Sequence, residues 1–220
     1  MTSWLGVALL PSPAHQTAAI RLQNDVGGGL ALHPPLSPDG NLPHVTVFQG
    51  PFLDSLDPST ELDRIVTAVG TSRCIALASA GVVYQPTGWV FLSLERRPLL
   101  EKIQQTALEA LTPHLDRAAF ERSKDVSQFS DEERESFARY GYRYTGAAYA
   151  PHITLGRAEE TVARELVRSV PGRVHVPEGW VFDRFSFYVM GESGAHAEIV
   201  EEVALATRAG SGSPSGVRTR

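Results

Sequence analysis

Two short segments, far apart in the chain, carry the same order of chemically active side chains. Each contains a histidine, an apolar residue, a threonine and a second apolar residue, and each follows a proline. The two tetrads are His44-Val45-Thr46-Val47 and His152-Ile153-Thr154-Leu155. Two such tetrads are improbable by chance in a chain of this composition. Because imidazole moves protons near neutral pH and a hydroxyl donates hydrogen bonds, the tetrads are the leading candidates for a functional site.

The spacing between the histidine and the threonine of each tetrad indicates a β-strand. Alternate side chains of a strand project from the same face, so each histidine is expected to point with its threonine while the apolar residues enter the core. Two such strands side by side would place two imidazoles and two hydroxyls around one cavity. A neutral imidazole can take a proton, a charged one can protonate a leaving oxygen, and the hydroxyls can bind phosphate oxygens. The pattern is typical of phosphoryl transfer without a metal ion.

The elements that must position the tetrads alternate between strands and helices. Strands are predicted from apolar and β-branched runs, and they are 4–10, 44–48 (ending at Gly50-Pro51), 74–84, 89–94, 152–155, 180–189 and 196–206. Helices are predicted from apolar residues at helical spacing, and they are 14–26, 58–69, 98–111, 131–140 and 159–170. Because hairpins occur among the alternating elements, we expect an α+β fold with largely antiparallel sheets. The element order repeats weakly between two halves, roughly 1–95 and 96–207.

Length and composition exclude several classes of protein. The 220 residues are 42% hydrophobic and 20% charged, which is ordinary for globular domains. The single cysteine, Cys74, excludes a disulfide framework and a Cys-rich metal site. No apolar run approaches the roughly 20 residues of a membrane helix, and no basic residue precedes Arg21, so we expect a cytoplasmic protein with no membrane partner. The net charge of −5 argues against a long groove for nucleic acid but is compatible with a short or terminal nucleotide.

With their flanks, the tetrads read His-Val-Thr-Val-Phe-Gln-Gly and Pro-His-Ile-Thr-Leu-Gly-Arg. These stretches resemble the motifs of the 2H phosphoesterase superfamily, specifically its 2′-5′ RNA ligase and cyclic phosphodiesterase branch. The resemblance implies one bilobal, pseudo-symmetric domain over residues 1–207, with lobes of roughly 1–95 and 96–207. Two mainly antiparallel sheets flanked by helices would surround a central cleft. Residues 208–220 are expected to form a disordered tail.

The resemblance also implies an activity. A phosphodiesterase of this kind needs neither metal nor cofactor, and it opens 2′,3′-cyclic phosphates, cleaves 2′-5′ or related phosphodiesters, or catalyses the reverse ligation. On this pattern His44 and His152 are the acid–base pair, and Thr46 and Thr154 hold the phosphate. In hydrolysis of a cyclic phosphate, His152 would activate water and His44 would protonate the leaving group, with the roles exchanged in the reverse direction. The expected partner is a nucleotide or an RNA terminus, bound by a monomer.

An inserted segment, 116–145, makes the interval between the histidines longer than compact members of this branch need. It ends in alternating aromatic and basic residues just before the second tetrad. We expect it to cover the cleft and to supply stacking or phosphate contacts to a substrate that carries a nucleobase. Four side chains are candidate substrate contacts, and they are Phe48, Tyr149, Arg157 and Arg143. A packing role is the alternative for Phe48 and Tyr149, and a surface role is the alternative for Arg157.

Other functions fit the same residues. A nucleotide-binding module without turnover is one, although binding alone needs no paired acid and base. A phosphoesterase that acts on a small molecule other than RNA is another. A zinc site formed by His44, His152 and a third histidine is weakly supported, because no close-spaced ligand pair or carboxylate accompanies them. The remaining histidines are interpreted as surface or locally satisfied residues, and they are His15, His33, His114, His175 and His196.

Overall fold

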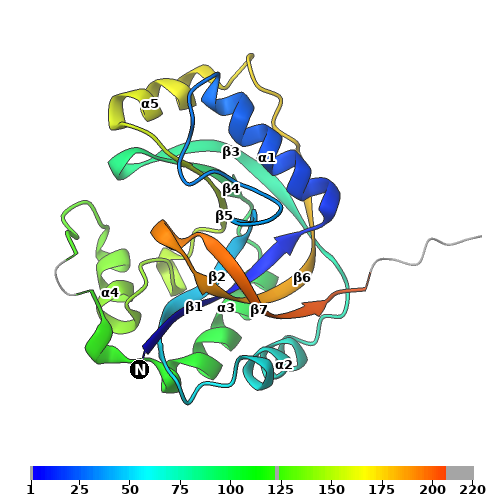
Figure 1. Ribbon diagram of the computed structural model, residues 1–220, viewed down its shortest axis with the longest axis vertical. Helices are drawn as coiled ribbons and strands as arrows, with labels where there is room; N and C mark the ends of the chain where they lie inside the picture. The colour runs from blue at the N-terminus through cyan, green and yellow to red at the C-terminus, as the bar shows by residue number, and fades with distance from the viewer. Residues whose placement is uncertain (1, 122–123, 207–220) are drawn as a thin grey trace, which may run out of the picture.

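Every predicted strand is present in the computed structural model, which describes residues 2–121 and 124–206. The strands are β1 (Thr2–Pro11), β2 (Val45–Leu53), β3 (Ile75–Gln85), β4 (Trp89–Leu94), β5 (His152–Arg157), β6 (Gly179–Met190) and β7 (His196–Ala204). All of their pairings are antiparallel, in the order β1-β2-β5-β4-β3-β6-β7 (Figure 1). The predicted α+β class with antiparallel pairing is therefore confirmed.

The predicted helices are also present, and local signals in the sequence set their ends. They are α1 (Pro13–Gly27), α2 (Pro58–Val69), α3 (Pro98–Leu111), α4 (Asp131–Tyr140) and α5 (Glu160–Ser169). Proline occupies the first turn of α1, α2 and α3, where its missing N–H costs no helical hydrogen bond. Ser130 and Glu133 form a capping box at the start of α4, and Gly70 ends α2 in the left-handed conformation.

The strands form one continuous hydrogen-bonded network rather than two separate sheets. β6 is long enough to pair with both β1 and β3. Its residues 182–189 pair with β1, and its residues 179–182 pair with β3. On the other side of the molecule, Val45 of β2 pairs with Ile153 of β5. Six strands therefore close into a ring, and β7 extends the sheet from β6. Neighbouring strands come from both sequence halves, since β5 lies between β2 and β4 while β6 lies beside β1 and β3.

β2 continues past Gly50-Pro51, where the sequence predicted its end. Pro51 lies opposite Trp4 of β1, and the β1 pairing runs on to Leu53. On its other side β2 pairs with β5 only at Val45. A proline is tolerated in such a strand because one edge of β2 makes almost no hydrogen bonds to a neighbouring strand, so the missing N–H of proline interrupts none there.

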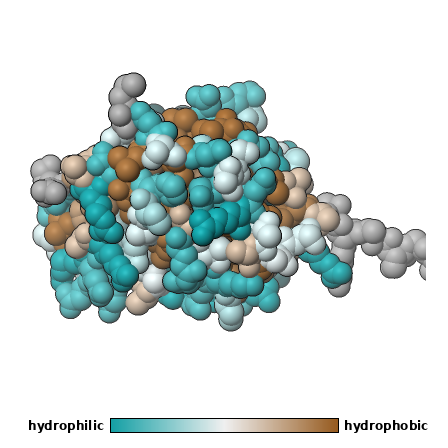
Figure 2. All heavy atoms as spheres, turned by 90° about the horizontal axis from the view of Figure 1, so that it is seen from below, coloured by the Kyte–Doolittle hydropathy of each residue, from teal (hydrophilic) through white to brown (hydrophobic). Residues whose placement is uncertain are grey.

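Helices cover both sides of the ring. α1 and α5 pack beside β3, β4 and β5, whereas α2 and α3 pack beside β2, β6 and β7 (Figure 1). The enclosed core is rich in large, fully buried aromatic side chains from β2 and β6. Hydrophilic side chains cover most of the face shown in Figure 2, with apolar ones between them. Across residues 2–121 and 124–206, no helix is long and apolar enough to cross a membrane. The predicted tail, 208–220, lies outside the described residues.

Candidate active site

The two tetrads meet at the junction of β2 and β5. Val45 pairs with Ile153 in antiparallel register, so extending that register by one residue puts His44 across from Thr154 and Thr46 across from His152. His44 and His152 are then diagonal neighbours, and diagonal neighbours on paired strands lie about 7–8 Å apart, a distance that a phosphate group can span. His44, Thr46, His152 and Thr154 all line one cavity of about 280 Å³. The structure therefore brings the four predicted side chains together.

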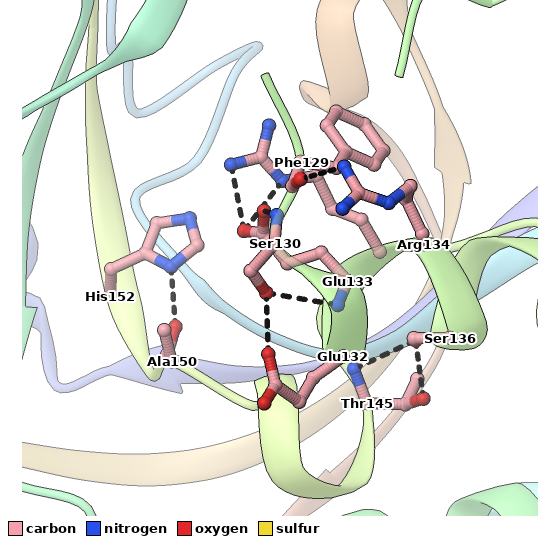
Figure 3. A network of polar contacts seen from close by, with 10 residues as sticks. Phe129, Ser130, Glu132, Glu133, Arg134, Ser136, Thr145, Ala150 and His152 are labelled. Atoms are coloured by element: carbon pink, nitrogen blue, oxygen red, sulfur yellow. Dashed lines mark hydrogen bonds and ion pairs between the residues drawn. The ribbon is translucent and has the colours of Figure 1, made fainter. Parts of the chain in front are cut away.

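Each histidine is held by a backbone carbonyl two residues before it. The Nδ1–H of His44 donates to the Leu42 carbonyl at 2.8 Å. The Nδ1–H of His152 donates to the Ala150 carbonyl at 2.6 Å, as Figure 3 shows. These bonds assign the same tautomer to both rings and leave Nε2 as the atom that can accept or donate a proton in the reaction.

Burial keeps both imidazoles neutral. Desolvation lowers the pKa of His44 to about 4, against a partial opposing effect of the Leu42 hydrogen bond. The pKa of His152 is also lowered to about 4, mainly by desolvation, with smaller contributions in the same direction from the electrostatic interactions with His44 and Arg143 and an opposing one from the Ala150 hydrogen bond. At pH 7 the protein without substrate therefore carries two neutral imidazoles, and not the one neutral and one charged ring expected near neutrality from the sequence.

Aromatic rings fix the orientation of each imidazole. Phe91 of β4 stacks on His152 with ring centroids 3.8 Å apart, and Tyr144 meets the same ring edge-on at 5.3 Å. His44 lies 5.3 Å from Tyr188 and 5.5 Å from His196. Packing on both sides limits the rotamers that either imidazole can adopt.

A β-bulge determines which residues of β2 face the cavity. Thr46 lies opposite Ala8 and Phe48 lies opposite Val7, so Val47 is an extra residue in the ladder. The bulge shifts the alternation, and Gln49 rather than Phe48 lines the cavity. Phe48 is fully buried. Its prediction as a substrate contact is wrong, because strict alternation does not hold across a bulge.

Gln49 is the residue of this strand that the sequence analysis missed. The Tyr188 hydroxyl donates to Oε1 of Gln49 at 3.1 Å, so the two N–H donors of its amide are free to serve the cavity. The Thr46 hydroxyl interacts with the phenols of Tyr142 and Tyr188, which ties Gln49 and Thr46 into one polar network.

The inserted segment 116–145 forms one wall of the cavity. Its lining residues include Lys124, Gln128, Phe129, Phe137 and Arg143. Arg143 lies over the rings of Phe129 and Tyr144, at 4.5 and 4.4 Å, and its Nη2 is 3.0 Å from Oε1 of Glu133 on α4. These contacts hold the guanidinium as a fixed cation beside His152. The opposite wall comes from Pro86, Thr87 and Trp89 at the β3–β4 hairpin.

A third histidine lies behind His44. His196 is fully buried and stacks on Tyr188, with centroids 4.4 Å apart, and its Nε2 is 2.9 Å from Oγ of Ser186. Burial lowers its pKa to about 3. Over residues 2–121 and 124–206, no group of three or more His, Cys, Asp or Glu side chains is placed to hold a metal ion.

Comparison with known proteins finds similarity among solved structures. No protein-family model and no curated protein matches the chain. Similar solved structures include TT0787 of Thermus thermophilus (15% identity, 93% of this chain and 99% of that one, TM-score 0.48). LigT of E. coli complexed with 3′-AMP is also similar (12% identity, 93% of this chain and 98% of that one, TM-score 0.45). So is Usb1 of Kluyveromyces marxianus (14% identity, 92% of this chain and 97% of that one, TM-score 0.45). A further similar structure is described as a phosphoesterase (13% identity, 93% of this chain and 99% of that one, TM-score 0.43).

Two other residues proposed as substrate contacts do not line this cavity. Tyr149 is buried in the core. Arg157 donates from Nε to the Thr87 carbonyl at 2.6 Å and lines a neighbouring cavity with His33 and Glu192. Leu155 is skipped between Thr154 and Gly156 in the ladder with β4, so β5 carries a second bulge.

Proposed function

We propose that the chain is a metal-independent phosphodiesterase that uses the two tetrads as a general acid and a general base on a nucleotide phosphodiester. A 2′,3′-cyclic phosphate or a 2′-5′ linkage is the proposed substrate. The observation that carries the proposal is the convergence of both imidazoles, in the same tautomer, and both hydroxyls on one cavity. Trp89 on one wall and Phe129 and Phe137 on the other offer aromatic surfaces that suit a nucleobase.

The reaction begins with proton uptake by His44. Both rings are neutral without substrate, and the negative charge of a bound phosphodiester favours the protonated form of a neighbouring imidazole. Arg143 lowers the pKa of His152 and so favours its neutral form. This difference supports His152 as the base and His44 as the acid in hydrolysis.

In the chemical step, Nε2 of neutral His152 takes a proton from water as the water oxygen bonds to phosphorus. The bond from phosphorus to one ribose oxygen breaks, and Nε2–H of His44 gives its proton to that oxygen. Thr46, Thr154 and the fixed cation of Arg143 stabilise the charge that builds on the other phosphate oxygens. The product is a phosphomonoester, and solvent exchange restores the two imidazoles. Each proton transfer typically contributes about 10²–10⁴-fold in rate.

Substitution of each histidine tests the proposal. His44→Ala and His152→Ala are each expected to lower kcat for a 2′,3′-cyclic nucleotide by at least about 100-fold, and EDTA is expected to leave the wild-type rate unchanged. His175→Ala, at an exposed position, is the matched control and should keep full activity. Circular dichroism verifies folding, and retained turnover in a folded His44 or His152 variant contradicts the proposal. A nucleotide Kd without any product would favour the binding-module alternative.

A further inference from the structure

Two buried glutamines lie outside the reacting groups. Gln23 of α1 is 4% exposed and Gln104 of α3 is 2% exposed, and both are surrounded by the apolar core. A buried amide is costly unless its donors and acceptor are satisfied, so the partners of these side chains show what each amide holds in place.

Gln104 connects the first tetrad to the chain that leads into the second. Its Nε2 donates to the carbonyl of Val47 at 3.0 Å and to the carbonyl of Tyr144 at 2.8 Å. Its Oε1 accepts from the backbone N–H of Gly146 at 2.9 Å. Val47 is the bulged residue of β2, while Tyr144 and Gly146 come just before His152.

Gln23 makes the corresponding connection in the opposite direction. Its Nε2 donates to the carbonyl of Leu155 at 2.8 Å and to that of Pro34 at 3.1 Å, and its Oε1 accepts from the N–H of Leu36 at 2.8 Å. Leu155 is the bulged residue of β5, and Pro34 and Leu36 belong to the loop that leads to the first tetrad.

The two connections are equivalent. Val47 and Leu155 each stand three residues after the histidine of their tetrad, and each is skipped by its neighbouring strand. A bulged residue leaves the regular ladder, so its carbonyl needs another donor, and a glutamine supplies it in both cases. The remaining bonds of each amide fasten the approach to the other tetrad.

We propose that Gln23 and Gln104 are positioning residues that set the placement of the two tetrads relative to each other. The inference rests on the proposed function, because it assigns the amides a role in aligning the acid with the base. Loss of an amide removes the hydrogen bonds that hold the bulge and the loop before the other tetrad. The two imidazoles are then no longer aligned to contact the same phosphate group. A displacement of about 1 Å at an active site can cost about 100-fold in rate.

Gln104→Met and Gln23→Met test the proposal, because methionine keeps the length and volume of the side chain but removes its hydrogen bonds. Each variant is expected to lower kcat for a 2′,3′-cyclic nucleotide by about 10- to 100-fold, with KM changed by less than about threefold. Gln105→Met is the matched control, since Gln105 is the exposed neighbour of Gln104 on α3 and its amide donates to Glu109 of the same helix. Its kcat should equal that of the wild type.

A second measurement is independent of turnover. Inorganic phosphate is titrated while the imidazole NMR signals of His44 and His152 are followed. In the wild type both signals are expected to respond with one Kd, and in the methionine variants that Kd should weaken at least about 10-fold or split into two. If the wild type turns over no nucleotide but this coupling is lost in the variants, the proposed function fails and the positioning role stands.

Folded variants with wild-type kcat and a wild-type phosphate response overturn the positioning role, even if their thermal stability is lower. That result would mean that the amides serve the core alone. Should Gln104→Met fail to fold, Gln104→Asn decides by the same criteria. Asparagine keeps the amide but is one methylene shorter, so it cannot reach the carbonyls of Val47 and Tyr144 together.

Discussion

At the scale of single residues, the burial of His44 makes the protein sensitive to acid. Its pKa is lowered from 6.5 to about 4 in the folded state. Between pH 4 and pH 6.5 the imidazole is therefore protonated in the unfolded chain but neutral in the folded protein. Stability therefore rises with pH across this window and is lost as the pH falls from about 6.5 to about 4. The contribution of His44 alone is roughly 3 kcal/mol.

Urea unfolding of wild type and His44→Gln at several pH values between 4 and 7 checks this expectation. The variant should lose roughly 3 kcal/mol less than the wild type on acidification over that range. His175→Gln, at an exposed position, serves as the control. Parallel curves for wild type and His44→Gln would show that the imidazole is protonated in the folded state.

At the scale of elements, the inserted segment 116–145 acts on the cavity through Arg143. Arg143→Met keeps an apolar side chain between Phe129 and Tyr144 but removes the fixed cation. Because a charge-assisted contact to phosphate is worth about 1.5–3 kcal/mol, KM for an anionic substrate should rise at least about 10-fold. Arg139→Met is the control, since Arg139 lies on α4 outside the cavity. Equal KM values for the two variants, measured by steady-state kinetics, would exclude a substrate contact by Arg143.

The elements also show how far the sequence predicts this fold. Helix ends followed from local signals such as the Ser130–Glu133 capping box, because a cap involves residues three apart. The shared cavity could be predicted from the tetrads because the histidine and threonine of each tetrad precede the bulge and follow regular strand alternation. The sequence predicted Phe48 as the cavity residue, whereas Gln49 lines the cavity. The bulge at Val47 causes this difference, and it depends on β1 and on Gln104, which are both remote in sequence. The sharing of β6 between β1 and β3 is likewise non-local, so no window of residues could reveal it.

At the scale of the whole molecule, the ring of strands concentrates the chemistry at one junction. Helices α1 and α3 each reach the strand that carries the tetrad of the other half, through Gln23 and Gln104. The two halves of the site are thus not independent modules. Alignment of the acid and base is a property of the closed sheet, which explains why the reacting groups can come from positions more than a hundred residues apart.

The charge of the whole molecule leads to a last expectation about substrate length. The chain carries 20 basic and 25 acidic residues, and its cavity is lined by only two basic side chains among the described residues, Lys124 and Arg143. A protein that neutralises few phosphates shows a shallow salt dependence, because few counterions are released on binding.

For the proposed activity, kcat/KM for a cyclic mononucleotide and kcat/KM for the same group at the end of a 20-nucleotide RNA should therefore differ by less than about threefold. Between 50 and 200 mM KCl both values should fall by less than about 10-fold. A strong preference for the longer RNA that disappears at high salt would reveal a basic path beyond the cavity and contradict this reading of the surface.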